Sequence, residues 1–143
     1  MVKYLYGLAA LIVLIDQITK LLVRFLDSSI DLGLFTINYV ENYGAGFGIL
    51  QGHRMLLILI TIAVVAVLTY YINTVKDYGI AIILGGALGN LIDRIFLGYV
   101  IDFIDFGFWP AFNIADSAIT IGAAMVIWDQ FRNKEFRNKE PTK

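Results

Sequence analysis

The stretch from Met55 to Ile72 constrains this chain more than any other part of it. Its eighteen residues carry no charged side chain, and a run of this length spans the hydrocarbon core of a bilayer as one helix. Three further apolar segments lie at Tyr4–Leu26, Tyr78–Ile92 and Phe112–Trp128. With 59% hydrophobic and 16% charged residues, the chain is too apolar for an ordinary soluble domain. We therefore predict an all-α integral membrane protein with four transmembrane helices.

The remaining composition narrows the classes of function. A net charge of −1 gives no reason to expect nucleic acid as a partner. The absence of Cys removes disulfides, thiolate metal sites and a Cys nucleophile. The single histidine, His53, cannot supply two ligands to a zinc ion, which argues against a zinc site. We therefore expect no metal and no cofactor.

Residues 27–52 differ from the apolar segments around them. The run from Asp31 to Val40 alternates loosely and is rich in β-branched and aromatic residues, which predicts short strands. Gly44, Gly46 and Gly48 follow closely, and glycines permit unusual backbone angles and close approach of another chain. An ordinary hairpin turn explains the same glycines.

Two oppositely charged residues lie inside the first apolar segment. Asp16 and Lys20 are four positions apart, so they share one face of a helix and can pair. One interpretation is an interfacial pair with a snorkelling lysine. The other is that this end of the helix faces a polar cavity.

The third apolar segment carries both packing and polar signals. Gly85 and Gly89 form a small-xxx-small pair, which lets helices pack closely in lipid. Asn90, Asp93 and Arg94 follow at spacings of three and four, which places them together at one end of the helix. Close packing does not explain these polar groups, and we interpret Asp93 and Arg94 as a structural charge pair.

The distribution of Lys and Arg predicts the orientation in the membrane. An even number of spans puts Lys3, Lys76 and the tail at residues 131–143, which contains the repeat FRNKE, on one side. The positive-inside rule makes that side the cytoplasm. We therefore predict one membrane domain at residues 1–130, followed by a polar cytoplasmic tail. The aromatic-rich segment Leu97–Ala111 is expected to lie in the interface. The extracytoplasmic end then collects Asp16, Asn42, Asn90, Asp93, Asp102 and Asp116.

Four carboxylates lie close together in sequence, at Asp93, Asp102, Asp105 and Asp116. Ionisable groups at membrane depth cost roughly 2.5–3.5 kcal/mol each, so they usually have a function. Two carboxylates close together in a low-dielectric site share a proton. One can then activate water as general base while the other polarises a carbonyl as general acid. Asp116 is favoured because it lies within a span, but spacing alone leaves Asp93, Asp102 and Asp105 open as its partner.

Two other functions fit polar groups inside a helical bundle. A small proton-coupled membrane carrier also uses intramembrane Asp and Asn residues and Gly-broken helices. Against this alternative, the chain shows no internal repeat of its polar motifs. A structural protein without activity would use the same groups only to join helices.

Five motifs occur in order along the chain, and together they closely resemble the lipoprotein signal peptidase (signal peptidase II) family. The resemblance extends over nearly the whole chain, up to Trp128. The motifs are Asp16-Gln17-x-Thr19-Lys20, Asn42-x-Gly44-Ala45-x-Phe47-Gly48, Gly85-Gly86-Ala87-x-Gly89-Asn90-x-x-Asp93-Arg94, Val100-x-Asp102-Phe103 and Phe112-Asn113-x-Ala115-Asp116-Ser117.

The resemblance implies a membrane aspartic endopeptidase that removes signal peptides from prolipoproteins, cleaving before the diacylglyceryl-modified Cys. It implies a small extracytoplasmic β-cradle at residues 30–52 and a short interfacial helix before the fourth span. It also implies a multi-pass protein of the cytoplasmic membrane, with both termini cytoplasmic and the active site at the extracytoplasmic face. The expected partners are the diacylglyceryl-modified prolipoprotein and membrane lipid, and we expect a monomer.

The resemblance also selects the dyad that spacing leaves open. The family's catalytic residues are the Asp of the V-x-D-F motif and the Asp of N-x-A-D-S, which correspond to Asp102 and Asp116. We hypothesise that the loop at residues 44–48 acts as a mobile clamp. Other matching positions are expected to bind substrate or support the site: Asp16, Lys20, Asn42, Gly44, Asn90, Asp93, Arg94, Asn113 and Ala115.

Overall fold

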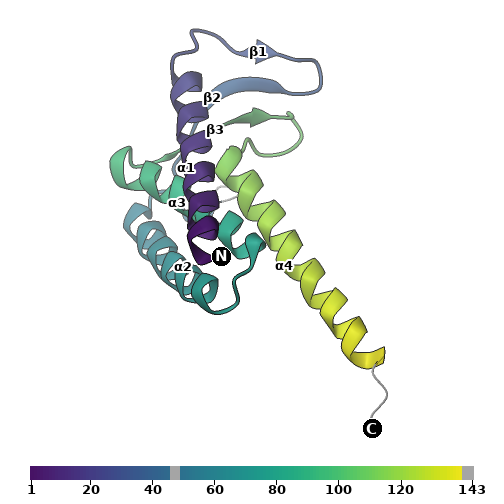
Figure 1. The fold of residues 1–143 in the computed structure, drawn as a ribbon. Helices are drawn as coiled ribbons and strands as arrows, with labels where there is room; N and C mark the ends of the chain where they lie inside the picture. Colours follow the sequence, from purple (N-terminus) through teal and green to yellow (C-terminus); the bar gives the residue numbers. More distant parts are fainter. Residues whose placement is uncertain (46–48, 140–143) are drawn as a thin grey trace.

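The computed structural model describes residues 1–45 and 49–139, with side chains described as far as Arg132. Over these residues the chain forms four α-helices and one small sheet (Figure 1). The mobile-clamp hypothesis concerns a loop whose residues 46–48 lie outside the described residues. The helices are α1 (Val2–Arg24), α2 (Arg54–Thr74), α3 (Tyr78–Phe96) and α4 (Ile114–Lys139).

Three of the described helices, α1, α2 and α3, are long and apolar enough to cross a membrane. A helix satisfies its backbone polar groups internally, which is what an apolar segment in lipid requires. The fourth helix, α4, carries Asp116 in its first turn and continues through charged residues to Lys139, so its apolar stretch is shorter. Three of the four predicted transmembrane helices are thus supported, and the fourth stays a prediction.

The central helix of the bundle is α3, which packs against α1, α2 and α4. Its glycines allow the close approach: a Cβ at Gly85 would lie 2.8 Å from the carbonyl oxygen of Ala9 on α1. A Cβ at Gly86 would collide with the carbonyl oxygen of Ala115 on α4. The close helix packing predicted from Gly85 is therefore confirmed. The buried apolar core between α1, α2 and α3 consists of Leu5, Ala9, Ile72, Ile80, Ala81 and Leu84.

The sheet has three antiparallel strands in the order β1 (Ile30–Asp31), β2 (Thr36–Asn42) and β3 (Val100–Asp105). The strands predicted between residues 31 and 40 are confirmed. The third strand, β3, lies within Leu97–Ala111, which we predicted to be an interfacial segment without a strand. The pairing places Val40 opposite Asp102 and Asn42 opposite Val100, and the register shifts between Ile37 and Val40. The fold is therefore mainly helical, and it contains a small sheet whose strands come from two distant segments of the chain.

The short interfacial helix predicted before the fourth span is not present in the described residues between β3 and α4. Residues 107–109 form bends, and Phe112 makes an isolated bridge to Ile104. The Phe112 N–H donates to the Ile104 carbonyl at 3.1 Å, and the Ile104 N–H donates back at 2.9 Å. Pro110 has no N–H to give to a helix, and Gly107 has a φ of +76°. Phe112 therefore pairs with the edge of the sheet, and residues 106–113 do not form a helix.

The sheet lies at one end of the helical bundle. The N-terminus, the α2–α3 connection and the distal end of α4 lie toward the other end (Figure 1). This arrangement brings the C-terminal halves of α1 and α3, the start of α4 and strand β3 to the same region, which contains the polar residues.

Candidate active site

The start of α4 fixes the position of Asp116 through local sequence. Asn113 directly precedes the helix, and its Oδ1 accepts the backbone N–H of Asp116 at 2.9 Å. In return, Asp116 Oδ2 accepts the backbone N–H of Asn113 at 3.4 Å. This reciprocal pair is a capping box, in which two otherwise unpaired N–H groups of the first turn are satisfied. The carboxylate also lies at the helix N-terminus, where the macrodipole favours a negative charge.

Asp102 approaches the same region from β3. Its side chain is 2% exposed, and its two oxygens accept one amide each. Asn42 Nδ2 donates to Oδ2 at 2.9 Å and Asn113 Nδ2 donates to Oδ1 at 2.7 Å. Burial raises the pKa of the Asp102 carboxyl to about 7, and the charge of Asp116 adds to this effect against the two amide donors. Asp102 is therefore suited to hold a proton near neutral pH.

Asn90 on α3 joins the two carboxylates. Its Nδ2 donates to Asp116 Oδ1 at 2.8 Å, and its Oδ1 accepts from Asn113 Nδ2 at 3.1 Å. Asn113 is fully buried and so connects Asn90, Asp102 and Asp116. Amides from three different elements therefore orient the pair of carboxylates.

A buried ionic cluster lies behind the carboxylates. The Lys20 side chain is 2% exposed, and its Nζ lies 2.8 Å from Asp16 Oδ2 and 2.8 Å from Asp93 Oδ2. It also donates to Asn90 Oδ1 at 3.1 Å. The predicted Asp16–Lys20 pair is confirmed, and the interpretation as a snorkelling interfacial pair is wrong. Asp16 Oδ1 additionally accepts the Ala115 N–H of α4 at 2.9 Å.

The predicted charge pair between Asp93 and Arg94 is wrong. Asp93 Oδ2 binds Lys20 and accepts the Ile101 N–H of β3 at 3.1 Å. Arg94 donates instead to the Gly44 carbonyl at 3.2 Å. Adjacent residues on a helix do not face each other, so Asp93 points toward α1 while Arg94 reaches the loop after β2.

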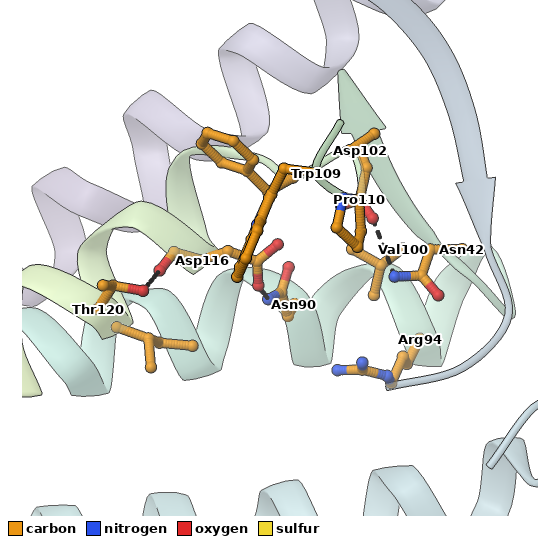
Figure 2. Close-up of a pocket in the computed structure, with 12 residues that line it drawn as sticks. Asn42, Asn90, Arg94, Val100, Asp102, Trp109, Pro110, Asp116 and Thr120 are labelled. Atoms are coloured by element: carbon orange, nitrogen blue, oxygen red, sulfur yellow. Dashed lines mark hydrogen bonds between the residues drawn. The ribbon is translucent and has the colours of Figure 1, made fainter. Parts of the chain in front are cut away.

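Both Asp102 and Asp116 line a cavity of about 280 Å³. Figure 2 shows Asp116 and Asn90 toward one side of this cavity in the view, with Asp102 and Asn42 toward the other. A second cavity of about 700 Å³ shares Asp102, and a third of about 380 Å³ shares Asp116. Each of these two cavities thus shares lining residues with the first. The lining of the first is completed by Arg94, Val100, Trp109, Pro110, Ala111, Phe112, Ile119 and Thr120.

Asp105, the remaining candidate partner of Asp116, is bound elsewhere. Its Oδ1 accepts the Gly107 N–H at 2.7 Å and its Oδ2 accepts from Asn38 Nδ2 at 3.3 Å. Among the residues that the structure describes, no group of three or more His, Cys, Asp or Glu side chains is placed to hold a metal ion. The arrangement offers two carboxylates of different environment facing one cavity.

Comparison with known proteins places the chain in a family. The profile of the family described as Signal peptidase (SPase) II matches residues 8–132. The chain belongs to the signal peptidase II family. A lipoprotein signal peptidase of Halothermothrix orenii is 45% identical over 138 residues, which cover 87% of this chain and 95% of the relative. One of Pelotomaculum thermopropionicum is 38% identical, covering 98% of this chain and 99% of the relative.

A solved structure has the same fold. A bacterial membrane enzyme determined by the in meso method at 2.3 Å resolution superposes with a TM-score of 0.85 at 32% identity. The match covers 99% of this chain and 94% of that one. As a member of this family the chain is a membrane protease, and the carrier hypothesis is not supported.

The structure gathers all of the sequence-predicted site residues of this signal peptidase II into one polar region. Asn42, Asn90, Arg94, Asp102 and Asp116 line the cavity. The others lie behind it or beside it, and their contacts are described above: Asp16, Lys20, Gly44, Asp93, Asn113 and Ala115.

Three contributors were missed from the sequence. Gln17 Nε2 donates to Asp93 Oδ1 at 2.9 Å and to the Gly89 carbonyl at 3.2 Å, which ties α1 to α3. Its place beside Asp16 was the available signal. Trp109 and Pro110 line the cavity, but nothing in the spacing of an irregular segment marks residues that close over a site.

Proposed function

We propose that this chain is an aspartic endopeptidase that removes the signal peptide from prolipoproteins, cutting before the diacylglyceryl-modified Cys. The observation that carries the proposal is the pair Asp102 and Asp116, which face one cavity from β3 and α4. The raised pKa of Asp102 allows the pair to hold one proton near neutral pH, which is the state that acid–base catalysis by two carboxylates requires.

The reaction follows from one proton shared by two carboxyl groups. The ionised carboxylate takes a proton from water, and the hydroxide adds to the scissile carbonyl carbon. The protonated carboxyl gives its proton to the carbonyl oxygen, so the tetrahedral intermediate is neutral. When the C–N bond breaks, the first carboxyl protonates the leaving amine and the second recovers a proton from the hydroxyl group. The dyad is restored, and one water has been consumed.

The substrate path is proposed to follow the cavities on either side of the dyad. The cavity beside Asp116 is lined mainly by side chains with apolar surface, including Trp109, Phe112 and Ile121. The cavity beside Asp102 is more polar, with Glu41 and Gln51. An extended peptide that carries lipid at one end suits such a path. The relatives are lipoprotein signal peptidases, which supports this substrate.

The proposed topology has four spans in the cytoplasmic membrane. The apolar part of α4 supplies the fourth, because Asp116 at its start turns into the bundle toward Asn90. The start of α1, the α2–α3 connection and the distal end of α4 lie toward the end of the bundle opposite the sheet (Figure 1). These segments carry Lys3, Lys76 and the basic residues Arg132, Lys134, Arg137 and Lys139. The positive-inside rule then makes both termini cytoplasmic, and the dyad lies at the extracytoplasmic face. We propose that the enzyme acts as a monomer among membrane lipids.

Cleavage of a diacylglyceryl-modified prolipoprotein by purified wild type, Asp102→Asn and Asp116→Asn tests the proposal. Each substitution keeps the shape but removes the acid, so we expect cleavage to fall by about 10³-fold or more. Asp105→Asn is the matched control, because it removes a carboxylate from the same strand whose partners are Asn38 and Gly107. It should leave cleavage within about threefold of wild type. Full activity of folded Asp102→Asn refutes the dyad and favours a structural role for Asp102.

A further inference from the structure

The ammonium group of Lys20 has a contact that charge pairing alone does not require. Asp16 and Asp93 each lie 2.8 Å from Nζ and neutralise it. The third contact, at 3.1 Å, is to Oδ1 of the neutral Asn90. An ammonium group has three hydrogens to donate and accepts none, and here each hydrogen has a partner. Lys20 therefore presents its remaining donor to the amide that binds Asp116.

This contact fixes the direction of the Asn90 amide. Asn90 Oδ1 receives both Lys20 Nζ and Asn113 Nδ2, each at 3.1 Å. If the amide were rotated by half a turn, its NH₂ would face two donors, one of them charged. The NH₂ must then point the other way, where it donates to Asp116 Oδ1 at 2.8 Å.

The two carboxylates consequently receive unequal support for a negative charge. The amide that binds Asp116 is polarised by a cation, and Asp116 also lies in the first turn of α4. Asp102 accepts from Asn42 and Asn113. The Asn113 NH₂ is also within hydrogen-bond distance of the Ile101 carbonyl at 3.1 Å, so its donation to Asp102 is shared. The donor to Asp116 is therefore the more strongly polarised one, and Asp102 is the carboxyl suited to hold the proton.

Two further electrostatic interactions reach the dyad. Arg94 on α3 interacts more strongly with Asp116 than with Asp102, so its charge favours the same difference, whereas the charge of Lys20 also acts on Asp102 through space. Asp93 on α3 and Asp16 on α1 are held by Lys20. Lys20 also acts on Asp116 through hydrogen bonds, because it donates to Asn90 and Asn90 donates to Asp116.

We propose that Lys20 is a positioning residue that orients Asn90 and thereby makes Asp116 the base that takes the proton from water, with Asp102 as the acid that protonates the carbonyl oxygen. The inference rests on the proposed function and deepens it, because it assigns the two roles that an Asp pair leaves open.

The test is the pH dependence of kcat in charge-matched variants. Removing Lys20 alone leaves Asp16 and Asp93 buried without their cation, and the protein can then fail to fold. The reference variant is therefore Asp93→Asn, which keeps the Lys20–Asn90 contact. Adding Lys20→Met to this variant gives the cluster of residues 16, 20 and 93 the same net charge as in wild type. Asn90→Leu is made in the same background, alone and together with Lys20→Met.

We expect Lys20→Met to move the acid limb of the pH–kcat profile upward by about one pH unit, because the polarised donor to Asp116 is lost. Asn90→Leu should cause a similar shift, and the two substitutions together should move the limb no further. A lower kcat with an unmoved acid limb would show that Lys20 only holds the helices together. Additive shifts would show that Lys20 acts through space and not through Asn90.

The same assay separates this inference from the proposed function. If Asp102→Asn and Asp116→Asn abolish cleavage while Lys20→Met leaves the acid limb in place, only the assignment by Lys20 fails. If either Asp variant cleaves like wild type, the dyad itself fails. For any variant recovered in low yield, kcat is divided by the fraction of folded protein, measured by Trp fluorescence. This correction does not change the pH at which the acid limb lies.

Discussion

Removal of the Asn42 amide should move the basic limb of the pH–activity profile to higher pH. In wild type, the pKa of Asp102 is about 7, so the proton needed for general acid catalysis is lost as the pH rises above 7. Asn42 Nδ2 donates to Asp102 Oδ2 at 2.9 Å and stabilises the ionised form. A hydrogen bond to a charged group contributes ~1.5–3 kcal/mol, which is about one to two pH units. Asn42→Leu should therefore place the basic limb near pH 8 to 9 by the same estimate.

The assay is kcat for cleavage of a diacylglyceryl-modified prolipoprotein between pH 5 and 10, normalised to the maximum of each variant. Normalisation matters because Asn42 Oδ1 also accepts the Gly44 N–H at 3.0 Å, so the substitution lowers kcat through the loop as well. The control is Asn38→Leu, which removes the other asparagine amide of β2, a donor to Asp105. Its profile should coincide with that of wild type. A basic limb that stays in place or moves to lower pH in Asn42→Leu would refute Asp102 as the acid.

Two further predictions concern stability in detergent. The pKa of Asp102 lies above its ordinary value of 3.8, so folded wild type keeps a proton that the unfolded chain has lost between about pH 4 and pH 7. Wild type should therefore lose stability relative to Asp102→Asn as the pH rises through that window, by at most about 4 kcal/mol. The Tm of Asp102→Asn minus the Tm of wild type should increase with pH, and a decrease would contradict the prediction. Gly89→Ala should destabilise by about 1–3 kcal/mol, because the new Cβ would lie 2.6 Å from Asp16 Oδ2. Gly7→Ala, whose Cβ would have no heavy atom within 4 Å, is the control and should leave Tm unchanged or raise it slightly, because alanine favours a helix more than glycine does.

The prediction for residues 97–111 was wrong in part. The aromatic residues between Leu97 and Ala111 indicated an interfacial segment, yet residues 100–105 form the strand that carries Asp102. The pattern is ambiguous because a buried edge strand and an interfacial segment have similar composition. Pairing with β2, more than fifty residues earlier in the chain, decided between them. The loss of the predicted interfacial helix has the same origin, because Phe112 pairs with Ile104.

The choice of partner for Asp116 also depended on distant contacts. Spacing placed Asp93, Asp102 and Asp105 on equal terms. The structure ties Asp93 to Lys20 and Asp105 to Asn38, which leaves Asp102 beside the cavity. Family motifs pointed to the same residue, but the residues by themselves carried no such distinction.

The sequence alone determined the membrane helices α1, α2 and α3 and the pairing of Asp16 with Lys20, because helical periodicity and hydrophobic length act locally. The capping box that sets Asp116 is equally local, since all of its atoms lie within four residues, although we did not predict it from the sequence. Only the tertiary structure decided which polar groups meet. Asn42, Asn90 and Asp102 belong to three separate elements, and a contact between distant segments depends on how glycines let helices approach and how strands set their register.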